Sequence, residues 1–349
     1  MPISIYNYEN SKIPLILEMI LHTSLGNEKH HYYIDSDWQY GPNTLIVFRN
    51  PLDEERIIDE LRDWVNHYII NHSPSEEAIV QKKTQYLRSQ KTLSEVEMRE
   101  GIDVDFMYDH GKVIQRPKKH GIYNSEHHRN VFDAYRFELN DLHLKILVEL
   151  ESMNAKEKAH LFLYMFIHIA TLFEDGPSRG YLTFLSHAQG FLSNIEARGL
   201  NSNIQHTFEE RRRALFADNA ICIKEGLDEL MVEWKMVWTR IAKEMHKNFD
   251  YRNYEGEEGI DLKPQLELLK SRLSKISNPF HDNLLKMGDE ELERFILSKK
   301  MLVFRDIVNL FYLSLPLFEQ SMVKKQFYAY STVKYYEDYF NGNVLYKIE

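Results

Sequence analysis

This chain of 349 residues has little cysteine and a shortage of basic residues relative to acidic ones, and both shortages exclude some kinds of site and partner. It has one cysteine, Cys222, which excludes a disulfide within the chain and a zinc site built from cysteines alone. Acidic residues outnumber basic ones, 53 against 43, and the formal charge is −10. Because proteins that bind phosphate backbones concentrate Lys and Arg, this balance argues against DNA as a partner. A polypeptide or a small molecule is the expected partner.

Long hydrophobic runs are also missing. The strongest one, residues 161–173, is shorter than the ~20 residues that cross a bilayer, and it contains His168. The N-terminus shows no basic start followed by a long apolar run, so no secretion signal is visible. These absences predict a cytoplasmic protein that does not act at a membrane.

No motif for a metal or a cofactor is present. The sequence contains no P-loop, no Gly-x-Gly-x-x-Gly and no His-Glu-x-x-His. The pairs His30-His31 and His127-His128 do not form a two-ligand face, since adjacent side chains on a helix point about 100° apart. The sequence therefore predicts neither a metal nor a cofactor.

The patterns that are present predict an α+β fold. Two short β-branched and aromatic runs flank Gly41-Pro42-Asn43, a turn signal, which predicts a hairpin over residues 32–49. A helix is expected from Pro51, and the chain from residue 71 to 121 is polar and irregular. Residues 1–121 are thus predicted to be a small α+β part containing a sheet.

The remainder, residues 122–349, shows the helical period and is predicted to be mainly helical, packed on the first part or integrated with it in one domain. The last helical stretch is expected to break at Pro316. The candidate helices cover residues 126–137, 141–153, 155–173, 180–198, 202–249, 264–276 and 289–340.

The helix over residues 180–198 contains the most informative histidine. Apolar residues from Phe184 to Ile195 recur with the period of one buried stripe, whereas Ser186, His187 and Gly190 lie on the other face. An imidazole near its ordinary pKa can pass protons at neutral pH. The alternative is a histidine that is simply exposed to solvent or hydrogen-bonded to the backbone, and spacing alone favours this alternative.

Two segments in this order resemble a known family. Residues 38–48, Trp-Gln-Tyr-Gly-Pro-Asn-Thr-Leu-Ile-Val-Phe, precede residues 180–192, Gly-Tyr-Leu-Thr-Phe-Leu-Ser-His-Ala-Gln-Gly-Phe-Leu. Together they resemble the glutamate-elimination domain of class I lanthipeptide dehydratases and its stand-alone relatives, the thiopeptide-type bacteriocin biosynthesis proteins. The resemblance implies an α+β unit fused to helices.

This chain departs from the elimination domains at their functional motifs. The alternating arginines of the early strand are missing after Pro42, and the Asn-Arg of the late helix is missing from the segment 279–287 that best matches it. Those groups are expected to hold and eliminate a glutamylated Ser or Thr. Their absence argues against glutamate elimination, and the chain is only as long as the second domain of a full dehydratase.

A short member without the elimination set is similar to the thiopeptide pyridine synthases. The resemblance implies a formal [4+2] aza-cycloaddition of two dehydroalanines, followed by loss of water and of the leader peptide, which leaves a pyridine in a macrocycle. The implied partners are a dehydrated, azole-containing precursor with leader and core, and other enzymes of the pathway. A monomer or a homodimer is expected.

The resemblance suggests roles for particular residues. The implied catalytic residues are His187 as proton shuttle, Tyr181 and Tyr123 as hydrogen-bond donors, Ser186 beside them, and His281 as a second-choice acid. The expected substrate-binding residues, led by an anchor for substrate carbonyls at position 179, are Arg179, Glu126, Arg129 and Trp38.

Two other functions stay open. The first is another elimination or lyase reaction on a leader-bearing peptide, and the second is a protein that binds the precursor without catalysis. A binding protein would tolerate the loss of His187 and Tyr181. An enzyme would lose turnover while it retains affinity for the peptide.

Overall fold

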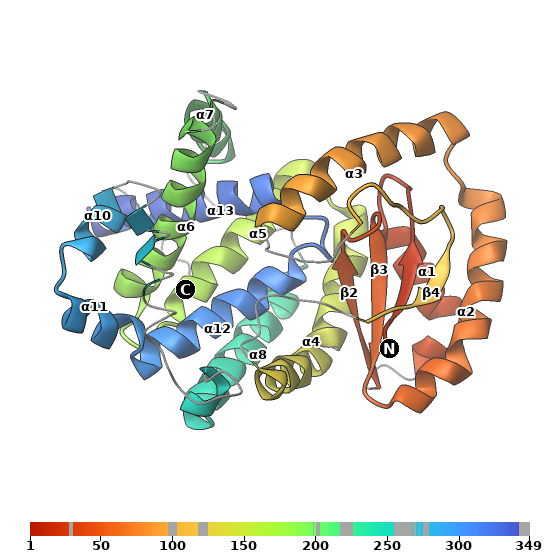
Figure 1. The fold of residues 1–349 in the computed structure, drawn as a ribbon, viewed down its shortest axis with the longest axis horizontal. Coiled ribbons are helices and arrows are strands. Elements are labelled where there is room, and N and C mark those ends of the chain that lie inside the picture. Colours follow the sequence, from red (N-terminus) through yellow and green to blue (C-terminus); the bar gives the residue numbers. More distant parts are fainter. Residues whose placement is uncertain are drawn as a thin grey trace. The chain divides into compact units, whose positions relative to one another are not determined.

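The computed structural model divides the chain into two compact units (Figure 1). Unit 1 comprises Met1–Ser152 and Leu310–Gln320, and unit 2 comprises Met153–Asn309 and Ser321–Glu349. The structure describes residues 1–27, 31–96, 103–117, 125–197, 199, 203–216, 226–254, 267, 270–271, 273–274 and 279–341. The division at residue 121 that the sequence suggested stays a prediction.

Unit 1 contains a four-stranded antiparallel sheet with the order β2-β3-β1-β4 (Figure 1). Its strands are β1 (Ile3–Tyr6), β2 (Tyr32–Asp37), β3 (Asn43–Phe48) and β4 (Val113–Gln115). Strands β2 and β3 pair from Tyr32 with Phe48 to Asp37 with Asn43, which confirms the hairpin predicted from the sequence. The small sheet and the mostly helical remainder confirm the α+β class.

One face of this sheet carries buried ion pairs. Side chains at alternate positions of a strand point to the same face, which places Asp35 and Asp37 together. Asp35 pairs with Arg136 at 2.5 Å, and Asp37 pairs with Arg116 at 2.9 Å. Breaking a buried pair of this kind leaves an unpaired buried charge, so these contacts fix the geometry of the hairpin.

The helices of unit 1 partly follow the sequence expectations. Helix α4 (Glu126–Ser152) is continuous, where two helices were predicted. The side chain of Asn140, in the middle of α4, accepts a hydrogen bond from the backbone N of Ile34 at the open edge of β2. Helix α3 lies in the stretch predicted to be irregular, and that prediction was wrong there. These helices are α1 (Ile13–His22), η1 (Ser24–Asn27), α2 (Pro51–His72), α3 (Glu76–Val96) and α4 (Glu126–Ser152).

Unit 2 is helical in its described part. The predicted break at Pro316 is confirmed, since α12 ends at Ser314 and α13 begins at Met322. The predicted helix 264–276 falls largely outside the described residues. The elements that begin in this unit are α5 (Ala155–Thr171), α6 (Pro177–Ala197), α7 (Ile204–Leu215), α8 (Asp228–Lys247), η2 (Tyr251–Tyr254), α10 (Pro279–Leu285), α11 (Asp289–Ile296), α12 (Lys299–Ser314) and α13 (Met322–Phe340).

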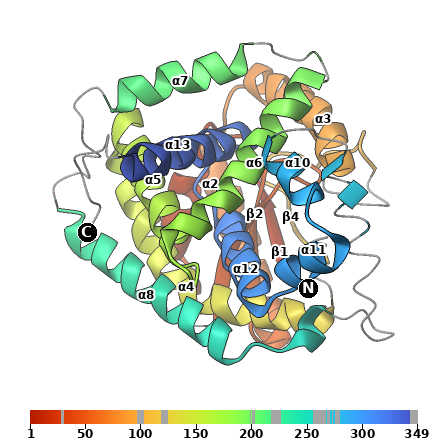
Figure 2. The same ribbon diagram turned by 90° about the vertical axis from the view of Figure 1, so that its left-hand side faces the viewer.

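Helix α6 packs against α5, α13 and α10 (Figure 2). A side-chain carbon at Gly180 would lie 2.0 Å from the carbonyl oxygen of Ala170 in α5, so only glycine permits this approach. One and two turns further, Phe184 and Ala188 are buried. Neighbours on several sides leave most other α6 residues half-buried, so the expected contrast between a buried and an open face is weak. Within the described residues, no helix is long and apolar enough to span a membrane.

The Gly180 contact leads to a stability prediction. Gly180→Ala should lower the free energy of unfolding by about 1–3 kcal/mol, because the added methyl group meets backbone atoms that cannot move aside. Gly190→Ala in the same helix is the matched control. Its side-chain carbon would sit 3.7 Å from His281 Cε1, an ordinary contact, so stability should be unchanged or higher. Urea titrations followed by circular dichroism measure both, and equal stabilities would contradict the close-contact account.

Candidate functional site

A serine and a histidine far apart in the sequence meet in unit 2. Ser186 Oγ on α6 lies 3.0 Å from His281 Nε2 on α10, which is a hydrogen-bonding distance. His281 is 5 % exposed, and Ser186 is half-buried. Gly190, one turn after Ser186, lies beside the His281 ring. A methyl group at position 190 would be in ordinary van der Waals contact with that ring. The sequence suggested both residues, and the structure brings them together.

His187 follows Ser186 on α6 and completes a set that we call the α6 cluster: Ser186, His187 and His281. The pKa of His187 is lowered to about 4, first by burial and then by the positive charge of Lys325 and by the neighbouring His281. The expectation of an ordinary histidine pKa was therefore wrong. Lys325 comes from α13, and no sequence pattern linked it to His187.

A lowered pKa changes what His187 can do. At neutral pH the imidazole is uncharged, with one nitrogen that donates and one that accepts a hydrogen bond. It can take a proton from a substrate and, once protonated, it is a stronger acid than an ordinary imidazolium. Its side chain is half-buried, so some contact with solvent remains. His187 can thus accept a proton and return it.

Tyr181 lies among aromatic rings of α13. Its ring centroid is 5.8 Å from that of Tyr336 and 5.9 Å from that of Phe340. Burial raises the pKa of Tyr181, and Glu337 raises it further, so the phenol keeps its proton and can donate a hydrogen bond. Phe340 is 46 % exposed, which leaves one side of this aromatic group open.

Arg179 and the remaining sequence candidates differ in setting. Arg179 is exposed in the first turn of α6, where its backbone N donates to the carbonyl oxygen of Gly176 at 3.2 Å. In unit 1, Glu126 and Arg129 are exposed on the first turn of α4. Trp38 is half-buried after β2, and its backbone N donates to Asp37 Oδ1 at 2.8 Å. Tyr123 lies outside the described residues.

Sequence reasoning missed the buried arginine that holds the turn after Trp38. Arg116 Nη1 donates to Gln39 Oε1 at 2.8 Å, and Nη2 donates to Asp37 Oδ2 at 2.9 Å. Its Nε donates to Ser4 Oγ at 2.9 Å. One side chain therefore joins three parts of unit 1 on both sides of Trp38. The signal that could have found it is the alternation of Asp35 and Asp37 in a strand, which requires buried positive partners.

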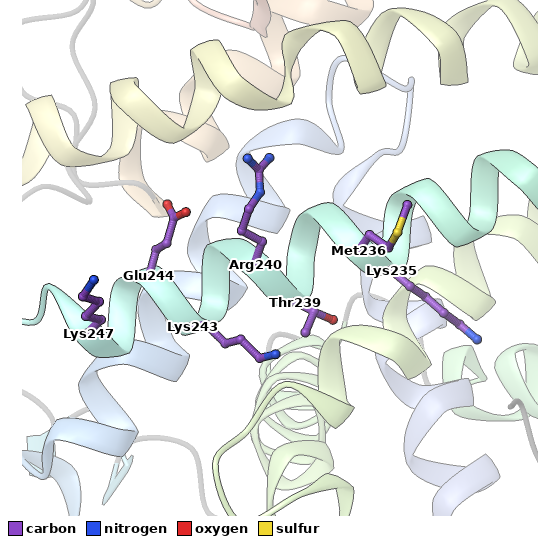
Figure 3. A pocket seen from close by; sticks show the side chains of 7 residues that line it. All are labelled: Lys235, Met236, Thr239, Arg240, Lys243, Glu244 and Lys247. Carbon is purple, nitrogen blue, oxygen red and sulfur yellow. The ribbon is translucent and has the colours of Figure 1, made fainter.

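A surface hollow lies elsewhere in unit 2, on α8 (Figure 3). None of the residues that line it belongs to the α6 cluster. The residues that line the hollow are Lys235, Met236, Thr239, Arg240, Lys243, Glu244 and Lys247.

Comparison with solved structures identifies proteins of similar fold. A pyridine synthase from thiomuracin biosynthesis, TbtD, matches with a TM-score of 0.58, over 97 % of this chain and 98 % of that one. The protein TsrL matches with a TM-score of 0.57, over 98 % of this chain and 95 % of that one. This chain shares its fold with both proteins. Sequence identity is 14 % to each, so the likeness concerns the fold and leaves the reaction open.

The comparison confirms, at the level of the fold, the resemblance that the sequence suggested. No family sequence model and no curated protein matches the chain. The roles of individual residues in this chain stay predictions, because nothing in the comparison assigns them.

The environment of His187 leads to a prediction on its titration. Nuclear magnetic resonance of the imidazole C–H groups, assigned with His187→Asn, should give a midpoint near the pKa of about 4 rather than the ordinary 6.5. The folded protein then binds this proton less readily than the unfolded chain. The contribution of His187 to stability should therefore be present above pH 6.5 and be lost as the pH falls from 6.5 towards about 4. A midpoint near 6.5 would contradict the packing around the ring.

Proposed function

We propose that this chain is a peptide-tailoring enzyme that joins two dehydroalanines of one leader-bearing precursor by a formal [4+2] aza-cycloaddition. Loss of water and of the leader peptide then gives a pyridine within a macrocycle. Two observations of different kinds support this proposal. The fold is similar to that of a pyridine synthase, and two residues of a Ser–His–His cluster, Ser186 and His187, lie on the helix that the sequence resemblance singled out.

The α6 cluster is the observation that carries the proposal. The reaction needs no strong nucleophile and no redox group, but it needs protons to move between weakly acidic positions of an amide. Neutral His187, with its pKa lowered to about 4, directly follows Ser186 on α6, and the Ser186 hydroxyl is hydrogen-bonded to His281 at 3.0 Å. This is a proton-transfer arrangement, and it does not require a group that is absent from the chain.

The steps balance in protons and bonds. His187 takes the N–H proton of the amide between two residues, while a donor protonates the amide oxygen, which gives the hydroxylated 2-azadiene. The ends of the azadiene then form two bonds to the second dehydroalanine and close a six-membered ring. His187 returns its proton to the ring hydroxyl, which leaves as water. One ring methylene then gives a proton back to the donor. The other gives a proton to the leader nitrogen, so that the leader departs as its amide and the ring becomes aromatic.

The remaining candidates have supporting roles in this proposal. Ser186, backed by His281, is the donor to the amide oxygen, and Tyr181 is a second donor whose raised pKa keeps it protonated. Arg179 holds substrate carbonyls at the start of α6. Trp38, Glu126 and Arg129 bind other parts of the precursor. Holding both reacting ends together supplies up to ~7–11 kcal/mol of the barrier in favourable intramolecular reactions.

The first prediction from this mechanism concerns His187→Ala. The variant should fold normally and bind the precursor, but form the pyridine product ~10²–10⁴-fold more slowly, because the proton transfer loses its base. Tyr181→Phe should show a smaller decrease. Mass spectrometry of the macrocycle and of the released leader amide measures both rates.

Two results would count against this assignment. If His187→Ala released leader and macrocycle at the wild-type rate, the shuttle would have to be sought at His281, at Tyr123 or in the substrate itself. If neither protein made a pyridine but both bound the precursor, the chain would be a binding protein or would catalyse another elimination.

A second prediction concerns the leader. Energy from binding a remote part of a substrate can orient the reacting centre, and a small dehydrated core offers few recognition groups. Titration calorimetry with the leader alone should therefore detect binding, and leaderless substrate should react slowly. No measurable binding together with full turnover of leaderless substrate would exclude a role for the leader.

A further inference from the structure

Helix α8 presents an open groove on its outer side. One row of side chains, spaced by four residues, consists of Val232, Met236, Arg240 and Glu244. A second row consists of Lys235, Thr239, Lys243 and Lys247. Figure 3 shows Arg240 and Glu244 leaving the helix on one side and Thr239 and Lys243 on the other, and all four line the hollow. Rows of this spacing form the ridges between which a ridge of another helix packs.

The opposite side of α8 is anchored, so the groove has a fixed shape. Trp234, Trp238, Ile241 and Met245 are buried, and the two indole centroids lie 5.3 Å apart. The outer row is open by contrast. Val232 is 54 % and Met236 is 61 % exposed, which makes two apolar side chains one turn apart available to a partner.

The rim of the groove is basic in a chain whose formal charge is −10. The residues that line the groove include one carboxylate, Glu244, and four basic side chains: Lys235, Arg240, Lys243 and Lys247. Neither Lys243 nor Lys247 is paired with a carboxylate among the described residues, and both are exposed. The aliphatic stems of the lysines and of the arginine add apolar surface beside Met236.

We propose that the α8 groove docks an acidic amphipathic helix of the peptide substrate, from a part of that peptide outside the reacting residues. Apolar side chains of this helix would fill the groove beside Val232 and Met236. Its carboxylates would face Arg240, Lys243 and Lys247. This proposal rests on the proposed function in one respect, namely that the docked helix belongs to the peptide substrate.

A second copy of the chain fits this surface poorly. A symmetric dimer through α8 would place the lysines of one copy against those of the other, which costs free energy. A nucleic acid would neutralise the positive charges of the rim, but it would not cover the exposed apolar side chains of Val232 and Met236. The acidic amphipathic helix satisfies both the charges and the apolar row.

The test measures binding to the full chain by fluorescence anisotropy. The probe is a labelled synthetic helix of roughly 20 residues, long enough to be helical, with Leu along one stripe and Glu on both flanks. A matched probe carries Gln in place of every Glu, and a single-stranded oligonucleotide of equal charge is the third ligand. The variant Lys243→Glu/Lys247→Glu reverses the rim, and Arg88→Glu/Lys91→Glu reverses two exposed cations of α3 as a matched control.

We expect the acidic helix to bind the wild-type chain, with an affinity that falls as salt is raised. The α8 variant should bind it ~10-fold more weakly, since two favourable charge contacts become repulsive, and the α3 variant should bind it as the wild type does. The Gln probe and the oligonucleotide should bind weakly to every variant. Equal binding by both double variants, or an oligonucleotide that binds as well as the helix, would overturn the proposal.

The outcome is separate from that of the proposed function. If α8-dependent binding of the acidic helix is found but no pyridine is formed from the precursor, the groove stands and the reaction is wrong. If pyridine forms at the same rate and with the same KM in the α8 variant and in the wild type, the groove is not used and the reaction stands.

Discussion

The close approach of two helices at Gly180 is the constraint on which the candidate site depends. A side-chain carbon there would lie 2.0 Å from the carbonyl oxygen of Ala170, so α6 can lie against α5 only with glycine at this position. Phe184 and Ala188 continue the contact along the same face. This packing sets the rotation of α6 about its axis and thereby directs Ser186 towards α10. The chemistry of the α6 cluster is a consequence of helix packing.

The sequence predicted the parts of the fold whose patterns are local. The hairpin followed from two strand-like runs around Gly41-Pro42-Asn43, and its pairing is as expected. Helix α3 was missed because its described side chains are mostly exposed or half-buried, so it has no clear apolar stripe. Helix α4 was divided in two because Asn140 resembles a helix end. In the structure its side chain accepts a hydrogen bond from the edge of the sheet.

The site was harder to predict because its environment is assembled from distant segments. Sequence spacing placed Ser186 and His187 on one helix, but nothing in it joins Ser186 to His281, 95 residues later. The pKa of His187 depends on burial by helices on several sides and on Lys325, which no periodic pattern of α6 reveals. A single sequence therefore supplies candidates, whereas packing decides which of them share an environment.

The pH dependence of pyridine formation tests the central claim most directly. If the α6 cluster moves the proton, kcat/KM for the dehydrated precursor should fall on the acid side with an apparent pKa near the value of about 4 for His187. That acid limb should vanish in His187→Ala, whose slower rate should not depend on pH in this range. An unchanged acid limb in the variant, or no pyridine from the wild-type chain at any pH, would contradict the account.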